Sequence, residues 1–300
     1  MSDSELKRYD KPALTFDEQL ELLERRGMTT EDRVRAVNVL QRISYYRLSA
    51  YWYPFKRDGD AFEPGTRFEQ ATRMYEFDRR LRLVILDAIE RFEVQARTRV
   101  TYQLGHTYGA FGYLEPSHFK PRFDHVGWLK GFLGEVERSH ETFTKHFRAR
   151  YEGFPRLPIW MASELMSLGS LSRLVEGLER RDRTALASEW GINAQLVPSW
   201  LHSITFVRNV CAHHGRLWNR ELAISPQLPK HDADLAELTN SRVFAILSIL
   251  KRATRSDPGT VQWTHEVATL LSELAGEPAL LLDMGAPSLW QPSSFRGAAP

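Results

Sequence analysis

The feature that most constrains this fold is a long interval without glycine or proline, from Thr66 to Leu104. Because either residue would weaken or break a helix, their absence predicts one long helix or two nearly collinear ones. Apolar residues recur within it at three- and four-residue steps, the spacing of a single buried helix face. They are Leu81, Ile85, Ala88, Ile89, Phe92 and Ala96. We therefore expect this helix to carry much of the core.

Start signals for helices are also clear elsewhere in the chain. Thr15 with Glu18, and Thr66 with Glu69, have the spacing of a capping box, in which each side chain binds the other residue's backbone N–H. A second helix is expected from about residue 29 or 30. Further helices are expected over 125–151, 159–180, 184–190, 197–214, 239–254 and 261–275, and strand alternation is nowhere sustained. The sequence predicts an all-α protein.

No internal repeat and no linker-like tract divides the chain, so the expected domain boundaries follow the helix pattern. We expect an N-terminal helical extension over 1–62, packed on a helical core over 63–277. The prolines at positions 278, 287, 292 and 300 predict an irregular C-terminal tail over 278–300 that finishes in a loose end.

Composition limits the classes of partner and compartment. Forty Lys and Arg against thirty-eight Asp and Glu give a net charge of +2, so any site for a polyanion must be local. Cys211 is the single cysteine, which excludes an intrachain disulfide and a cysteine-based zinc cluster and points to a reducing compartment. No apolar stretch approaches the roughly 20 residues of a membrane span. We expect a cytoplasmic protein with no membrane contact, no metal and no cofactor.

The common catalytic signatures are absent, including phosphate-binding glycine loops, dinucleotide turns and His-Glu-x-x-His. One segment nevertheless concentrates charge. Between Arg208 and Arg220 there are three arginines and two histidines and no acidic residue. This segment is a local cationic patch on a nearly neutral protein.

The helix expected before this patch has a buried face and a polar face. The buried face is predicted to hold Trp200, Ile204, Val207 and Cys211. Asn209 lies away from that face, four residues before His213, where a hydrogen bond between the two would hold the imidazole in one tautomer. Arg208 lies about 140° from His213 on an ideal helix. The two can share a site if the helix ends near Gly215, if the arginine bends over, or if a second copy supplies the facing half.

An imidazole and a guanidinium suit cleavage of a phosphodiester without metal. The imidazole has a reference pKa of about 6.5 and can move a proton at neutral pH. The guanidinium binds phosphate oxygens in a bidentate manner and favours the charge that develops on them. RNA supplies its own nucleophile, the 2′-hydroxyl, so no catalytic serine or cysteine is needed.

The string from Arg208 to Arg220, RNVCAHHGRLWNR, resembles the hallmark of the Abi-like (abortive infection) family of bacterial proteins, within the HEPN superfamily. Supporting stretches lie at 14–16, 22–27, 43–48 and 157–164, so the resemblance covers roughly residues 12–285. It implies a HEPN-like helical bundle that acts as a metal-independent endoribonuclease, commonly a homodimer in which arginine and histidine motifs face each other. It also implies a toxin-like role in phage defence, restrained by a small-RNA or protein antitoxin.

The superfamily pattern is an arginine, a polar residue and a histidine after four to six intervening positions. Arg208, Asn209 and His213 match it with four, and His214 matches with five. We assign His213 because Asn209 reaches it by helical spacing, and keep His214, which falls nearer the buried face, as the second candidate. Arg216 and Arg220 either contact RNA phosphates or are solvated cations favoured by the helix dipole.

Several assignments stay open. Glu93 and Arg97 have the spacing of a surface ion pair, but an acid from their helix, Glu90 or Glu93, could instead orient His213 or Arg208. The aromatic cluster over 45–55 either stacks RNA bases or anchors a core or an interface. A non-catalytic RNA-binding module, or a helical scaffold that blocks phage replication through partner contacts, is the alternative to an enzyme.

Overall fold

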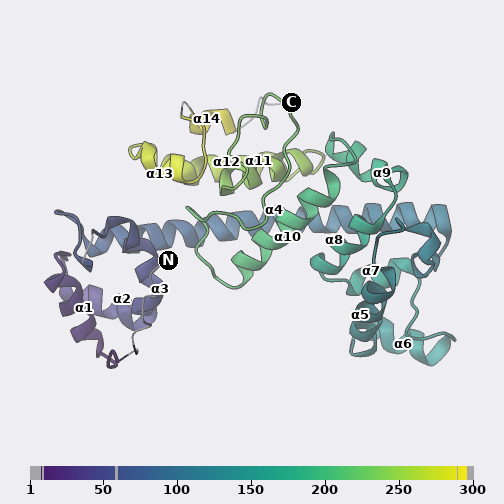
Figure 1. Cartoon of the computed structure of the whole chain (residues 1–300), viewed down its shortest axis with the longest axis horizontal. Coiled ribbons are helices and arrows are strands. Elements are labelled where there is room, and N and C mark those ends of the chain that lie inside the picture. Colours follow the sequence, from purple (N-terminus) through teal and green to yellow (C-terminus); the bar gives the residue numbers. More distant parts are fainter. Residues whose placement is uncertain (1–7, 9, 58–59, 289, 296–300) are drawn as a thin grey trace, which may run out of the picture. The chain divides into compact units, whose positions relative to one another are not determined.

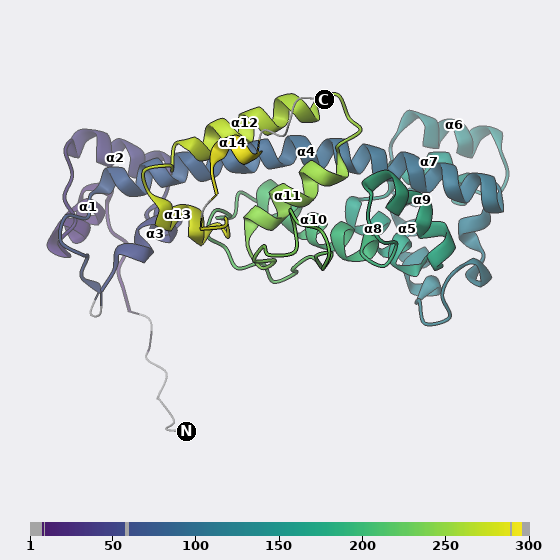
Figure 2. The same ribbon diagram turned by 90° about the horizontal axis from the view of Figure 1, so that it is seen from above.

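The computed structural model describes residues 8, 10–57, 60–288 and 290–295 (Figures 1 and 2). About 63% of these residues are helical and none of them forms a β-strand, which confirms the all-α class. The α-helices are α1 (Phe16–Arg25), α2 (Arg33–Arg42), α3 (Tyr45–Trp52), α4 (Phe68–Tyr108), α5 (His125–Glu137), α6 (Thr142–Arg150), α7 (Ile159–Leu165), α8 (Leu168–Gly177), α9 (Arg180–Trp190), α10 (Val197–Ala212), α11 (Val243–Ala253), α12 (Thr260–Ser272), α13 (Pro278–Asp283) and α14 (Pro292–Phe295). Short 3-10 turns follow α3 and precede α5.

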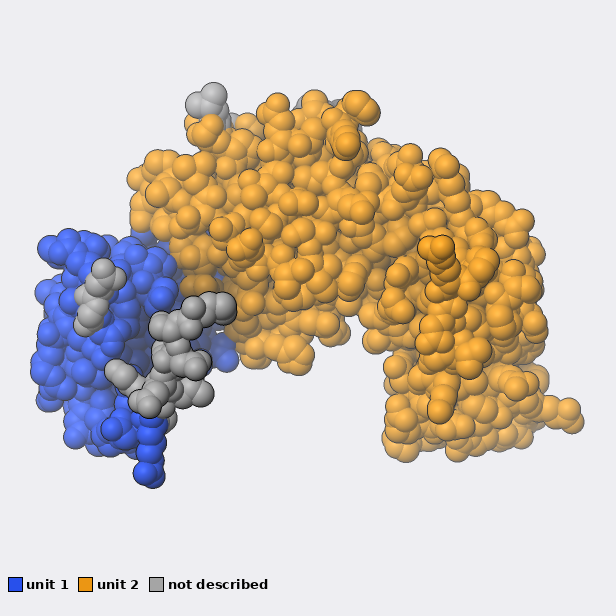
Figure 3. Space-filling model, viewed as in Figure 1, with its two compact units in different colours: residues 1–79 blue, residues 80–300 orange. Residues whose placement is uncertain are grey.

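The chain divides into two compact units, residues 1–79 and 80–300, whose boundary falls inside α4 (Figure 3). The predicted domain boundaries at 62 and 277 remain a prediction. In residues 1–79, the predicted capping box of α1 is formed: Thr15 N donates to Glu18 Oε2 at 2.7 Å and Glu18 N donates to Thr15 Oγ1 at 3.3 Å. The buried side chains of this unit include Leu20, Leu23, Leu40, Leu48 and Trp52.

The aromatic cluster over 45–55 serves mainly as core. Trp52 is buried and packs edge-on against Tyr45 at 5.1 Å between ring centroids. The buried Tyr51 donates its hydroxyl proton to Asp78 at 2.6 Å. Tyr46 and Tyr53 are exposed, so within this cluster base stacking remains a prediction for these two rings.

The start of α4 differs from the expected capping box. Arg67 N donates to Gln70 Oε1 at 2.8 Å, so one half of a capping box occurs one residue later than predicted. The carboxylate of Glu69 is engaged elsewhere, because its Oε1 accepts from Thr30 Oγ1 at 2.8 Å and from Glu31 N at 3.1 Å. A tertiary contact has therefore displaced the local cap.

Within residues 80–300, α4 is the single long helix that the missing glycines and prolines predicted. The six apolar residues of its predicted stripe are at most 1% exposed, which confirms that face as core. α12 lies alongside α4 in both ribbon views, and Trp263 Nε1 donates to Val84 O at 2.8 Å (Figures 1 and 2). On the α9 side, the ring of Phe92 packs on Trp190 at 4.8 Å.

Two expected helices are each broken in the structure. The one expected over 125–151 is split into α5 and α6 at Ser139, whose hydroxyl accepts from Glu141 N at 3.3 Å. The one expected over 159–180 is split into α7 and α8 at Ser167, whose hydroxyl accepts from Ser170 N at 3.1 Å. In both places a serine offers the backbone a local hydrogen bond that competes with helix continuation.

The C-terminal region is more regular than predicted. The short helices α13 and α14 occupy the stretch expected to be irregular, and Phe295 is only 3% exposed. Its ring packs against Trp263 at 5.9 Å and Phe244 at 6.2 Å. These apolar contacts stabilise an ordered conformation of this stretch, despite its prolines. The loose end expected beyond, at 296–300, lies outside the described residues.

Candidate functional site

α10 presents the predicted buried face and ends at the cationic patch. The four stripe residues Trp200, Ile204, Val207 and Cys211 are at most 2% exposed. Arg208, on the flank of this face, and Asn209, on the opposite side, are exposed. α10 lies beside the middle of α4 (Figure 1), so its position is fixed by the buried face while its polar face stays open.

The helix stops in a Schellman turn that positions both histidines. His214 N donates to Cys211 O at 3.0 Å and Gly215 N donates to Val210 O at 2.8 Å, the two bonds that define this motif. His214 adopts a left-handed backbone with φ of 57°, which costs a non-glycine residue about 1 kcal/mol. Gly215 follows in close packing, because a Cβ there would lie 3.1 Å from Val210 Cγ1. From α4, Arg82 NH1 donates to Gly215 O at 3.2 Å.

The turn changes the interpretation of the two histidines. His213 is the C-cap of α10 and His214 follows it outside the helix, and both side chains are exposed. The expectation that His214 falls nearer the buried face is therefore wrong, since helical spacing no longer applies after Ala212. The choice between His213 and His214 rests on spacing from Arg208 alone and stays a prediction.

Arg208 and Asn209 contact each other. Arg208 NH1 donates to Asn209 Oδ1 at 3.4 Å, a long hydrogen bond between exposed groups. The expected side-chain bond from Asn209 to His213 is not formed among the described residues, because the Asn209 oxygen faces Arg208 instead. The two residues are joined instead by a backbone hydrogen bond, in which His213 N donates to Asn209 O at 3.0 Å.

Arg216 and Arg220 lie in the loop that follows, and both are half-buried. Arg220 Nε donates to Arg216 O at 2.6 Å, so part of this guanidinium holds its own turn. Leu217 is fully buried beneath the loop, and Arg242 NH1 donates to Asn219 O at 2.8 Å. The loop is therefore anchored on both sides, and a role of either arginine in phosphate binding remains a prediction.

A pocket of about 360 Å³ brings Arg208 together with the acids of α4 that the sequence singled out. We call it the α4–α10 pocket, and its lining residues are Leu86, Ile89, Glu90, Glu93, Val94, Arg97 and Arg208. His213 does not line it. Of the apolar walls, only Ile89 was named from the sequence, as part of the core stripe. Leu86 and Val94 were not identified, although their spacing around Glu90 and Glu93 on one helix was a visible signal.

The charged residues from α4 in this pocket have different environments. Arg97 is 13% exposed and binds Glu93 by an ion pair, while its NH1 donates to the α7 carbonyl of Ser163 and, at 2.9 Å, to Met166 O. This confirms the expected Glu93–Arg97 pair and ties α7 to α4. Glu90, by contrast, is exposed and has no hydrogen bond or ion pair with any described residue.

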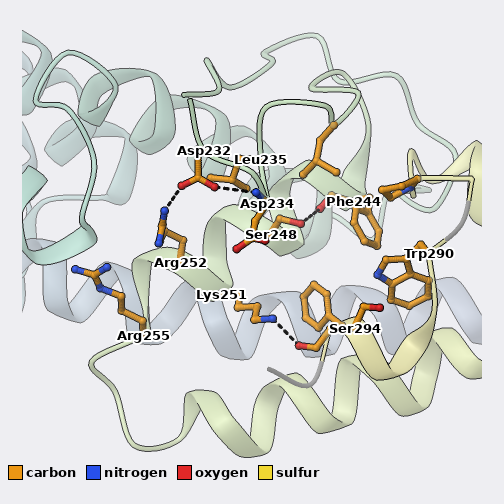
Figure 4. Close-up of a pocket in the computed structure, with 13 residues that line it drawn as sticks. Asp232, Asp234, Leu235, Phe244, Ser248, Lys251, Arg252, Arg255, Trp290 and Ser294 are labelled. Carbon is orange, nitrogen blue, oxygen red and sulfur yellow. Dashed lines mark hydrogen bonds and ion pairs between the residues drawn. The ribbon is translucent and has the colours of Figure 1, made fainter. Parts of the chain in front are cut away.

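A second pocket, of about 320 Å³, lies between α11 and the C-terminal segment (Figure 4). We call it the α11–C-terminal pocket. Arg252 forms an ion pair with Asp232, and Lys251 Nζ donates to Phe295 O at 2.8 Å while lying 5.0 Å from the Phe295 ring centroid. Burial lowers the pKa of the Lys251 ammonium below its usual value. Arg255, at the rim, is exposed.

Over the described parts of the chain, no helix is both long and apolar enough to span a bilayer. The same residues contain no group of three or more His, Cys, Asp or Glu side chains arranged to hold a metal ion.

Comparison with known proteins gives one match. The model of the Abi-like protein family matches residues 38–219, more than half of the chain. The matched region contains Arg208, Asn209, His213 and His214, together with the α4 side of the α4–α10 pocket. No curated protein and no solved structure matches the sequence. The extent of the family match shows that this chain belongs to the Abi-like protein family.

Proposed function

We propose that this protein is a metal-independent endoribonuclease of the HEPN type that acts as an abortive-infection effector in phage defence. The observation that carries the proposal is that the side chains of Arg208 and His213 are available to a ligand. Both are exposed, and neither side chain forms an ion pair with a described residue. Arg208 lies near the end of α10 and His213 is its C-cap. An available guanidinium and an available imidazole suit a phosphodiester substrate.

Each residue has a distinct role in this proposal. Arg208 binds the oxygens of the scissile phosphate and stabilises their charge as the 2′-oxygen attacks phosphorus. His213 transfers the proton that the 2′-hydroxyl must lose and the leaving 5′-oxygen must gain. The P–O5′ bond breaks, which leaves a 2′,3′-cyclic phosphate and a 5′-hydroxyl. Asn209 orients Arg208 through its Oδ1, a contact that the free enzyme already has.

The acting site is composed of two copies of the chain. Arg208 lines the α4–α10 pocket and His213 does not, which supports a site in which the two groups come from different copies. A homodimer with a twofold axis near the end of α10 would let the Arg208 of one copy face the His213 of the other. In the cell, we expect growth arrest when the enzyme is released from an antitoxin, either a small RNA or a protein.

The test is cleavage of single-stranded RNA by purified protein in EDTA. We expect cleavage by the wild type and a loss of at least about a hundredfold in His213→Ala, the usual contribution of a general acid or base. His202→Ala is the matched control, because His202 is an exposed histidine of the same helix. Equal cleavage by wild type and His213→Ala would refute the proposal.

Arg208→Lys separates catalysis from mere RNA binding. A lysine keeps the charge but cannot form the bidentate contact, so we expect it to bind RNA nearly as well as the wild type and to cleave poorly. If Arg208→Lys and His213→Ala both leave phage resistance intact, the protein acts instead as a scaffold or a non-catalytic binding module.

A further inference from the structure

We propose that the α4–α10 pocket binds one nucleobase beside the phosphate held by Arg208, and that the Glu90 carboxylate makes it select guanine. This inference rests on the proposed function and names the feature of the RNA substrate that the same site would recognise.

The pocket contains one cation and one acid that the protein itself does not neutralise. Arg208 has a single long hydrogen bond, to the neutral side chain of Asn209. Glu90 has no partner among the described residues, whereas Glu93 is bound to Arg97. A complementary ligand therefore needs an anionic group at the Arg208 end and N–H donors at the Glu90 end. A nucleotide has both, on its phosphate and on the edge of its base.

The remaining walls of the pocket suit the flat face of a base. Leu86, Ile89 and Val94 line it from successive turns of α4. Ile89 is buried, whereas Val94 is 56% exposed, so an apolar surface runs from the core to solvent beside Glu90. Proteins that hold an unstacked base use apolar side chains against its faces and hydrogen bonds to its Watson–Crick edge. About 360 Å³ is at the small end of ligand pockets, which fits one nucleotide and not a longer segment.

A carboxylate on the base edge discriminates strongly between bases. Guanine presents N1–H and N2–H side by side, and an ionised carboxylate accepts both in the bidentate geometry that it also forms with arginine. Adenine and cytosine each place an acceptor nitrogen next to their amino group, which repels the carboxylate. Uracil flanks its single N–H with two carbonyl oxygens. Glu90 is therefore expected to favour guanine over the other three bases.

The experiment measures cleavage of labelled oligonucleotides that are identical except for one central residue, which is guanosine, inosine or adenosine. For the wild type we expect kcat/KM to be at least about tenfold higher with guanosine than with adenosine, and inosine, which lacks the N2 amino group, to lie between them. In Glu90→Gln the ratio of guanosine to adenosine should fall to within about threefold of one. Glu135→Gln is the control, because Glu135 is an exposed acid on α5, outside the pocket, and should keep the wild-type ratio.

Failure of this inference can be distinguished from failure of the proposed function. If the wild type cleaves all three oligonucleotides equally in an Arg208-dependent reaction, the endoribonuclease proposal survives and the guanine pocket is refuted. If no RNA is cleaved, calorimetry with guanosine 3′-monophosphate and adenosine 3′-monophosphate tests the pocket directly. Tighter binding of the guanosine compound that is lost in Glu90→Gln supports the pocket. Equal binding of the two compounds overturns it. So does an absence of binding by both the wild type and Glu90→Gln, when the two proteins have identical circular dichroism.

Discussion

The α4–α10 pocket and the α11–C-terminal pocket have similar volumes, about 360 and 320 Å³, and each is lined by arginine, acid and apolar side chains. They differ in how the protein uses its charges. In the α11–C-terminal pocket, Lys251 is held by the carbonyl of Phe295 and Arg252 by Asp232. In the α4–α10 pocket, Arg97 is held in the same manner, but Arg208 and Glu90 are left without an ionic partner among the described residues. The other pocket has one such arginine, the exposed Arg255, which lies outside the region matched by the family model.

The number of cations around a cavity therefore says little about its function. A cation whose hydrogen bonds are already satisfied by carbonyls and carboxylates fixes the fold, because removing it leaves those acceptors unpaired. A cation kept without an acid is available for an anionic ligand. By this criterion Lys251 and Arg252 are excluded, and of the two arginines without an acid, Arg208 and Arg255, only Arg208 lies in the region 38–219 that the family model matches. Arg208 is therefore the cation that we propose binds RNA.

Removal of the available cation should reduce RNA cleavage more than any other change considered below. Arg208→Gln should lower RNA cleavage by about a hundredfold or more, because one group that stabilises the developing phosphate charge is lost. Arg255→Gln is the matched control, an exposed arginine at the rim of the other pocket, and should cleave like the wild type. If the two variants lose activity equally, the comparison between the pockets is wrong.

Mixing two inactive variants tests whether Arg208 meets His213 of a second copy. After unfolding and refolding together, Arg208→Gln and His213→Ala chains should form mixed dimers in which one of two composite sites is intact. Random pairing predicts recovery of about a quarter of wild-type cleavage. Mixed dimers that are isolated by two affinity tags and remain inactive would refute a composite site.

Within the α4–α10 pocket, we expect the free energy of unfolding to depend on Arg97 and hardly on Arg208, the reverse of what we expect for RNA cleavage. Arg97→Met leaves Glu93 and the carbonyls of Ser163 and Met166 without their donor, so we expect the free energy of unfolding to fall by about 3 kcal/mol. Arg208→Gln should change it by less than about 0.5 kcal/mol. Urea unfolding followed by circular dichroism measures both, and a larger loss for Arg208→Gln than for Arg97→Met would reverse the assignment.

The smallest effect concerns pH and the α11–C-terminal pocket. Burial lowers the pKa of Lys251 in the folded protein, so in the window between that pKa and the unfolded value near 10.4 the unfolded chain binds more protons. The contribution of Lys251 to stability therefore rises as the pH increases through this window. Relative to Lys251→Met, the wild type should become more stable toward pH 10, as measured by urea unfolding at each pH. A difference that stays constant or falls would show that Lys251 is not desolvated by the C-terminal segment.

Much of the helical framework could be predicted because its signals are local. The capping box at Thr15, the core stripe of α4 and the buried face of α10 each follow from side-chain spacing within one helix. The predictions failed where a distant residue intervened. Glu69 is drawn away from its cap by Thr30 and Glu31, and Phe295 orders a proline-rich tail through apolar contacts.

The candidate site was predictable in its residues but not in its geometry. The run from Arg208 to His214 is visible as a cationic patch after a helix, and the acids of α4 were identified as possible neighbours. The left-handed backbone at His214 was not predictable, because Gly215 beside it is the residue that normally takes that conformation. The partners of Arg97 on α7 are carbonyls, which leave no trace in the sequence.

We propose that Arg208 and His213 cleave RNA by attack of the neighbouring 2′-hydroxyl. Mass spectrometry of the products formed in EDTA tests it most directly, since the ends of the fragments record which bond was made and which was broken. We predict 2′,3′-cyclic phosphate and 5′-hydroxyl ends for the wild type and no such fragments for His213→Ala. Fragments with 3′-hydroxyl and 5′-phosphate ends, or the same cyclic-phosphate products at equal yield from His213→Ala, would contradict the account.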